Sequence, residues 1–165
     1  MLALLAVKPF EAITVRDICA ESSVHYATFF RHYPGKEALL DAVAQDQIAA
    51  LNALAVEARA SGDFATGFTA LCRYVEEHRE LWAVLLNGGA GAAMREEWVR
   101  QSQRVAANET PVNTWLPPEL GTIIAATMIA ETLAWWVAQP PGAHSAEAVA
   151  ALLLRLQTGS TLARD

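Results

Sequence analysis

Apolar residues recur along most of the chain with the three- to four-residue spacing of amphipathic helices. The sequence contains no convincing alternating strand and no internal repeat. Proline, glycine and serine divide the pattern into segments that predict helices at about 1–8, 15–21, 26–32, 36–60, 64–78, 80–87, 92–108, 118–138 and 145–157. We therefore expect an all-α protein.

The two short predicted helices, 15–21 and 26–32, are separated by only a few residues. Thr14 is a favourable N-cap for the first, Ser22-Ser23 interrupts it, and Pro34-Gly35 ends the second. Two short helices joined by a tight turn have the outline of a helix-turn-helix, whose second helix enters the DNA major groove. We expect a three-helix head over residues 1–45, joined by the long helix to a helical body over residues 46–165.

The second short helix has side chains for a core and others for a partner. Phe29 and Tyr33 share one face and can anchor the helix to the head. The residues left away from that face are Tyr26, Ala27, Thr28 and Phe30. Thr28 and His32 can hydrogen-bond to phosphate oxygens, while the exposed aromatic rings can pack on thymine methyl groups or sugars.

Three further side chains stand at helix starts and suit a nucleic acid. Lys36 opens the long helix, so a cation and free backbone N–H groups point the same way, as an anion site requires. Thr14 offers a second such site at the start of the helix that precedes the turn. Arg16, in the first turn of that helix, could reach a guanine edge.

The segment ITVRDICAESSVHYATFFRHYPGKEALL resembles the N-terminal signature of the tetracycline-repressor (TetR) family of bacterial transcriptional regulators. The family pattern is roughly T-x-x-x-I-A, then A-G-V-S, then T-[LF]-Y-x-[HY]-F, then P-x-K-E-x-L. The matching residues, in order, are Thr14, Ile18, Val24, Thr28, Phe29, His32, Pro34, Lys36, Glu37 and Leu39. The resemblance covers the head, and the body matches in outline as a run of helices that ends in two apolar ones.

The resemblance implies a homodimer in which the last two helices of each subunit form a four-helix bundle. It also implies a body pocket for a small effector, whose binding changes the spacing of the two heads. Its DNA-binding residues would be Thr14 and Lys36 for phosphates, Arg16, Tyr26 and Ala27 for bases, and Thr28, Phe30 and His32 for the backbone. We expect a cytoplasmic transcriptional regulator that binds double-stranded DNA. Repression is the commonest activity in this family.

The sequence departs from the family pattern at several positions. Phe30 stands where the family usually has Tyr, and His25 replaces the usual capping Ser. Ser23 replaces the turn Gly, which predicts a positive φ at this residue. The first helix is shorter than in the family, so either translation begins upstream or the head lacks part of its scaffold.

Charge is also modest for a DNA-binding protein. The whole chain has a net charge of −6, and residues 8–36 carry four Lys or Arg against three Asp or Glu, a net of +1. DNA affinity would then be modest and steeply salt-dependent. These features leave an alternative open, in which a helical dimer with a degenerate head serves as a ligand-binding or protein-interaction module.

Bulky side chains in the body are candidates for the effector pocket: Phe64, Phe68, Leu71, Trp82, Leu85, Trp98, Met128 and Glu131. Glu131 lies in the middle of an apolar helix, where an unpaired charge is costly. It could pair with an arginine such as Arg104 or Arg155, face solvent at the edge of the bundle, or bind a polar or cationic effector.

The segment from Gly121 to Ala138 carries Glu131 as its one ionisable residue, together with three threonines. We interpret it as a helix of the bundle core or the dimer interface rather than a membrane span. The dimer seam is expected to include Trp135, Trp136, Val149, Leu152, Leu153 and Leu156.

Catalytic and cofactor signals are weak throughout the sequence. We find no nucleophile–base pair, no metal-ligand spacing and no phosphate-binding loop, so neither an enzyme nor a cofactor is expected. Cys19 and Cys72 lie singly within helical patterns and are expected to be small core residues in a reducing cytoplasm.

Overall fold

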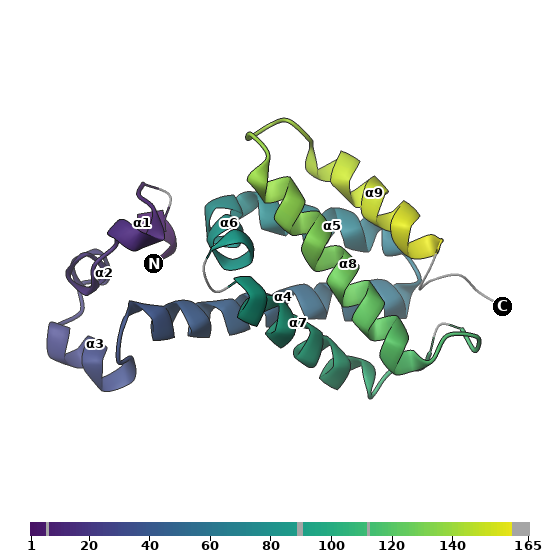
Figure 1. Cartoon of the computed structure of the whole chain (residues 1–165), viewed down its shortest axis with the longest axis horizontal. Helices are drawn as coiled ribbons and strands as arrows, with labels where there is room; N and C mark the ends of the chain where they lie inside the picture. The colour runs from purple at the N-terminus through teal and green to yellow at the C-terminus, as the bar shows by residue number, and fades with distance from the viewer. Residues whose placement is uncertain (6, 89–90, 112, 160–165) are drawn as a thin grey trace. The chain divides into compact units, whose positions relative to one another are not determined.

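A computed structural model describes residues 1–5, 7–88, 91–111 and 113–159, and all regular secondary structure in these ranges is helical (Figure 1). The all-α prediction is therefore confirmed. The chain divides into two compact units, Met1–Gln47 and Ile48–Asp165. The helix α4 (Lys36–Ser61) begins in the first unit and ends in the second.

The first unit contains the short helix α1 (Leu2–Leu5), the 3-10 helix η1 (Phe10–Ala12), α2 (Val15–Ser22), α3 (Tyr26–His32) and the start of α4. The bounds of α2 and α3 agree with the sequence prediction within one residue, whereas η1 was not predicted. Ile13, Ile18, Phe29 and Leu40 are buried and form the core of this unit. A helix-turn-helix is thus built around α2 and α3.

The second unit contains the rest of α4 with α5 (Phe64–Glu77), α6 (Arg79–Asn87), α7 (Gly91–Ala106), α8 (Pro118–Ala138) and α9 (Ala146–Thr158). α8 packs against α6, α7 and α9, and α5 packs against α9. α8 and α9 run side by side (Figure 1). Gly67 allows α5 to approach α4 closely, because a Cβ at this position would overlap the Cβ of Ala58.

α8 is long and apolar enough to cross a membrane by length and composition, with a mean hydropathy of 1.5. Core helices of helical bundles can have the same length and hydropathy, and the contacts of α8 with α6, α7 and α9 agree better with such a helix. The residues that it buries inside the second unit are Ala126, Ala130, Leu133, Ala134, Trp136 and Val137. Its apolar character is therefore used in part for packing within the chain.

Arg79 fixes the C-terminal end of α8. Its guanidinium donates hydrogen bonds to the carbonyls of Trp136 (2.6 Å) and Gln139 (2.8 Å) at this helix end. It also lies 5.4 Å from the centre of the Trp136 ring. The indole N–H of the buried Trp136 in turn donates to the carbonyl of His144 at 3.0 Å. These bonds hold the loop that returns the chain to α9.

The turn between α2 and α3 is made by Ser23, which has a φ of 54° and a ψ of 34°. The positive φ predicted from the sequence is confirmed. The Ser23 N–H bonds to the carbonyl of Ala20 at 3.3 Å, and the Val24 N–H bonds to that of Cys19 at 3.0 Å. A left-handed residue with a Cβ is disfavoured, so the turn contains local strain.

Ser23→Gly is expected to stabilise the first unit by about 0.5–1 kcal/mol, because glycine adopts this conformation without the Cβ penalty. Amide hydrogen exchange in α2 and α3 measures the effect. Ser22→Gly is the matched control, since Ser22 is helical and its hydroxyl donates to the Ile18 carbonyl at 2.7 Å. This variant is expected to lower stability by about 1 kcal/mol. Faster exchange in Ser23→Gly than in the natural protein would contradict the prediction.

Candidate nucleic-acid interface and effector cavity

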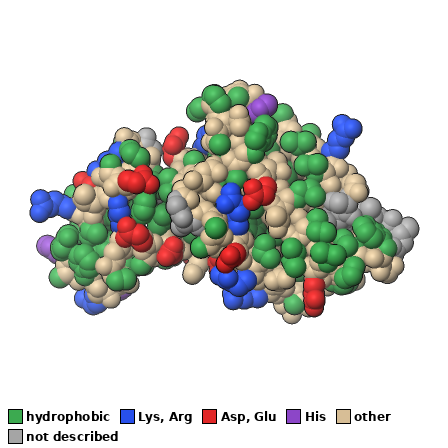
Figure 2. Space-filling model, in the orientation of Figure 1, with side chains coloured by type: hydrophobic (Ala, Val, Ile, Leu, Met, Phe, Trp, Pro, Cys, Tyr) green, Lys and Arg blue, Asp and Glu red, His purple; other side chains and the backbone are tan. Residues whose placement is uncertain are grey.

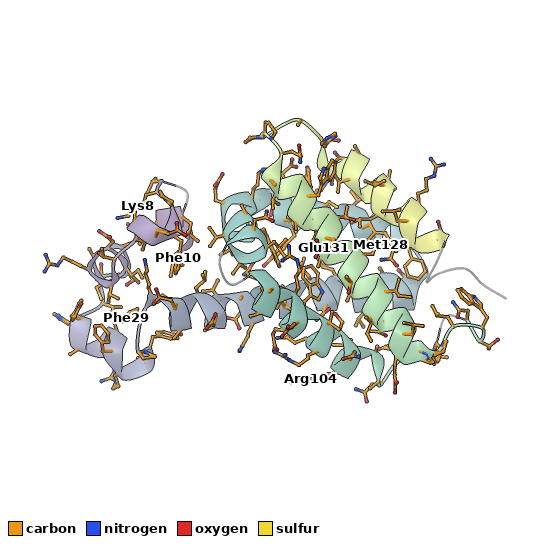
Figure 3. All side chains as sticks on the ribbon, in the orientation of Figure 1. Lys8, Phe10, Phe29, Arg104, Met128 and Glu131 are labelled. Carbon is orange, nitrogen blue, oxygen red and sulfur yellow. The ribbon has the colours of Figure 1, made fainter. Side chains whose placement is uncertain are left out.

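α3 is anchored on one side and open on the other. Phe29, labelled in Figure 3, is only 6% exposed, and its ring centre lies 5.8 Å from that of Tyr33. Tyr26 and Phe30 are 56% and 44% exposed, and their ring centres are 4.9 Å apart in an edge-on arrangement. Large exposed aromatic side chains on a buried anchor form a surface suited to a partner.

The remaining candidates on α3 take the positions that the sequence indicated. Ala27 and His32 are exposed, and Thr28 is half-buried. Arg31 is also exposed in the last turn of the helix, although sequence analysis did not single it out. His25 precedes the helix but makes no side-chain capping hydrogen bond. α3 therefore offers rings, a hydroxyl, an imidazole and a guanidinium, but begins without a capping side chain.

Thr14 begins α2 through a reciprocal pair of hydrogen bonds with Asp17. The Asp17 N–H donates to the Thr14 hydroxyl oxygen at 3.2 Å, and the Thr14 N–H donates to the Asp17 carboxylate at 2.8 Å. The Thr14 hydroxyl proton is directed to the same carboxylate at 2.7 Å. Lys8 forms an ion pair with it, also at 2.7 Å. The hydroxyl that was assigned to a phosphate is thus engaged within the chain.

The hydrogen bonds from Lys8 and then Thr14 hold the pKa of Asp17 well below its usual range. A depressed pKa stabilises the fold above the unfolded-state value, and that contribution is lost as the pH falls towards the folded-state pKa. We therefore expect the first unit to lose stability below about pH 4, near the ordinary Asp pKa. In Asp17→Asn this pH-dependent loss should be smaller, so the two unfolding curves converge in acid. Parallel curves from neutral to acid pH would contradict the expectation.

The Lys36 side chain does not point to a free phosphate site, as the sequence had predicted, but is bonded within the first unit. Its ammonium group donates hydrogen bonds to three backbone carbonyls, those of Phe10 (2.9 Å), Glu11 (3.1 Å) and Ile13 (2.9 Å). It also lies 4.6 Å from the centre of the Phe10 ring. An ammonium has three N–H donors, so this arrangement uses all of them. The side chain joins η1 to the start of α4 and is not free for a phosphate.

The exposed cations of the first unit are therefore few. Arg16 and Arg31 are exposed, and neither makes an ion pair within the described part of the chain. Positive and negative side chains are interspersed on the face of this unit that Figure 2 shows. Attraction to a polyanion must then come from separate arginines and from backbone N–H groups rather than from a broad basic surface.

The second unit contains a cavity of about 180 Å³ between α4, α5, α7, α8 and the segment that precedes α8. Among the residues predicted for an effector pocket, Phe64, Phe68, Leu71 and Trp98 line it. Asn52 and Ser102 also line it but were missed, although a polar residue on the apolar face of a helix was a usable signal.

The other predicted pocket residues lie elsewhere. Trp82 and Leu85 are buried in the packing of α6, and the Trp82 ring centre lies 5.8 Å from that of Trp98, behind the cavity wall. Met128 and Glu131 are also absent from the described lining. A helical stripe of bulky residues does not reveal which members face a cavity and which fill the core.

Glu131 pairs with Arg95, with 2.6 Å between the Arg95 Nε and a carboxylate oxygen. The suggested partners Arg104 and Arg155 were wrong, and the possibility of an arginine partner was right. Glu131 lies on α8 and Arg104 on α7 (Figure 3). Arg95 is nearer the start of α7, so the register between α7 and α8 selects it.

Metal and thiol chemistry find little support in the described residues. No group of three His, Cys, Asp or Glu side chains there could hold a metal ion. Cys19 and Cys72 are buried free thiols. Burial, with smaller contributions from Glu76 and Glu147, raises the pKa of Cys72 to about 12, so the reactive thiolate is disfavoured.

Comparison with known proteins agrees with this geometry. Residues 2–43 match the family described as bacterial regulatory proteins, tetR family. The fold resembles the crystal structure of a TetR transcriptional regulator from Streptococcus agalactiae 2603V, with a TM-score of 0.60 and 22% identity over 94% of this chain and 87% of that one. No curated protein matches in sequence. Residues 2–43, which contain the helix-turn-helix, therefore match the TetR family of bacterial regulatory proteins, and the whole chain shares the fold of a solved TetR regulator.

Proposed function

We propose that the protein is a homodimeric transcriptional regulator that binds double-stranded DNA through α2 and α3, and that it acts as a repressor released by a small effector. One observation carries the proposal: Phe29 anchors α3 while Tyr26 and Phe30 remain exposed on its outer side. An interior helix of a purely structural unit would bury such rings. A recognition helix presents them to a groove.

The proposed contacts follow from which donors are free. Arg16, Tyr26 and Ala27 are assigned to base edges, because α2 and α3 leave them exposed. The sugar–phosphate backbone is assigned to Thr28, Phe30, His32 and Arg31. The side chains of Thr14 and Lys36 are engaged within the chain, so we do not assign them to phosphates. The backbone N–H groups at the starts of α2 and α4 are assigned to phosphates instead. Phe30 contributes apolar contact only, since it lacks the hydroxyl of a tyrosine.

Exposed apolar side chains on the last two helices support the proposed dimer: Leu120, Ile123 and Trp135 on α8 and Leu152 and Leu156 on α9. Trp136, Val149 and Leu153 are buried within the chain instead, so we leave them out of the seam. Pairing through α8 and α9 would cover the exposed side chains. In the DNA-bound dimer the two α3 helices are expected to lie about 34–36 Å apart, one turn of the duplex.

A selection from a random duplex library, followed by fluorescence anisotropy at several salt concentrations, tests DNA binding. Arg31 is the exposed arginine assigned to the sugar–phosphate backbone, so a dimer would neutralise about two phosphates through it, and the slope of log K against log salt is expected near −2. Tyr26→Ala is expected to relax sequence preference, while Arg31→Ala should weaken all duplexes alike. Failure of the full chain to enrich any duplex, or binding without salt dependence, would refute the proposal.

The second candidate function is a ligand-binding or protein-interaction module with a degenerate head. The internal engagement of Thr14 and Lys36 favours it, because both side-chain donors are used in hydrogen bonds within the chain. The same duplex experiment separates the two functions, since sequence-selective binding would dismiss the module. We assign no catalytic activity in either case.

A further inference from the structure

The cavity of the second unit has a mainly apolar lining with a few polar side chains. Phe64 and Phe68 of α5 and Trp98 of α7 supply aromatic rings, and Leu51 and Ile129 supply aliphatic side chains. Asn52 of α4 and Ser102 of α7 lie in this lining. Sites for small molecules commonly combine an apolar lining with a few polar groups that fix orientation.

Asn52 is 8% exposed, and its carboxamide is only half satisfied. Its side-chain oxygen accepts a hydrogen bond from the Ser102 hydroxyl at 3.1 Å. Its amide nitrogen, Nδ2, is buried and has no hydrogen-bond partner among the residues that the structure describes. A buried donor without a partner costs about 1–3 kcal/mol, so a group that supplies an acceptor at this position gains affinity.

The polar pair offers the same chemistry in either orientation of the amide. As described, Asn52 presents an N–H donor and the Ser102 oxygen retains acceptor capacity. If the amide were turned over, Asn52 would donate to Ser102 and the Ser102 hydroxyl proton would become the free donor. In both arrangements one donor of the pair lacks a partner in the described part of the chain.

We infer that this cavity binds a small, uncharged, mainly apolar molecule whose carbonyl or similar acceptor oxygen is held by the Asn52–Ser102 pair. The volume of about 180 Å³ suits one aromatic ring with a short substituent, since a cavity of roughly 150 Å³ holds benzene. Among the described lining residues Glu109 is the one ionisable side chain. The lining therefore offers no cation for an anionic ligand.

This inference rests on the effector-responsive function proposed above and names the class of effector. Asn52 belongs to α4, the helix that begins at Lys36 directly after the helix-turn-helix. Ser102 belongs to α7, so an oxygen bound by the pair would contact two helices at once. A ligand that contacts α4 therefore contacts a helix whose first residues belong to the unit with the helix-turn-helix.

Two probes of nearly equal shape test the polar position. Acetophenone carries a carbonyl where α-methylstyrene carries a CH₂ group, so only the first can accept a hydrogen bond. Their affinities for the full chain are measured by isothermal titration calorimetry. In Asn52→Leu combined with Ser102→Ala, the ratio of acetophenone to α-methylstyrene affinity is expected to fall about tenfold. Asn52→Asp keeps the side-chain shape and should also weaken acetophenone, in case the double variant does not fold.

Gln101→Leu is the matched control, because the Gln101 amide donates to Glu97 at 3.1 Å and does not line the cavity. This variant should keep the ratio of the natural protein. An unchanged ratio in the cavity variants, tighter binding of benzoate than of acetophenone, or no binding of either probe would overturn the inference. Duplex binding is measured separately, so these outcomes do not by themselves refute the proposed regulator.

Discussion

Phe29→Ala is expected to destabilise the first unit by about 3–4 kcal/mol, because it removes a buried ring and leaves a cavity in a small core. The ring is 6% exposed and contacts both Phe30 and Tyr33. Loss of this anchor should release α3, so selective duplex binding should disappear as well. Amide hydrogen exchange in α2 and α3, with anisotropy on the selected duplex, measures the two effects.

Phe30→Ala is the matched control, since the two phenylalanines are adjacent and differ mainly in burial. Phe30 is 44% exposed, so its removal should change stability by less than about 1 kcal/mol. Duplex affinity should nevertheless fall, because the exposed ring is assigned to the sugar–phosphate backbone. If Phe30→Ala destabilised the unit as much as Phe29→Ala, the assignment of an inner and an outer side to α3 would be wrong.

Lys36→Met is expected to destabilise the same unit by about 2–4 kcal/mol. The variant keeps an unbranched side chain but removes three charge-assisted hydrogen bonds to the carbonyls of Phe10, Glu11 and Ile13. Two of those bonds are partly buried, so water cannot fully replace the ammonium. Exchange of the amides in η1 and α2 should accelerate, whereas exchange in the second unit should stay unchanged.

The effect on DNA separates a positioning role from a phosphate contact. At a temperature where Lys36→Met remains folded, the slope of log K against log salt should equal that of the natural protein. If the magnitude of the slope fell by about two for the dimer, Lys36 would contact a phosphate directly, as the sequence suggested. Lys36→Arg should lie between the two proteins in stability, because a planar guanidinium cannot reproduce three divergent N–H donors.

The helical framework was predictable because its signals are local. Thr14 at an N-cap and Pro34-Gly35 at a helix end define short segments that no distant contact needs to specify. The positive φ at Ser23 followed from the family resemblance instead, because the family pattern has a glycine at this turn. η1 was missed because three residues between Pro9 and Ile13 carry no periodic pattern.

The side-chain network of the site was less predictable, because it depends on contacts between distant residues. The Lys36 side chain reaches carbonyls 23 to 26 residues earlier in the chain, and only the folded path of η1 brings them together. Arg95 was missed as the partner of Glu131 because the register of α7 on α8 sets that pair. Asn52 was overlooked although a polar residue four positions after Ile48 interrupts an apolar helix face.

The Arg79 clamp on the end of α8 has a consequence for assembly. Because these bonds and that of the Trp136 indole secure the α8–α9 hairpin within one polypeptide, the surface that we propose for the dimer would form within a single subunit. Association can then proceed between prefolded subunits, without coupled folding. Dilution should accordingly yield compact single subunits that reassociate quickly on mixing, rather than denatured chains that must refold first.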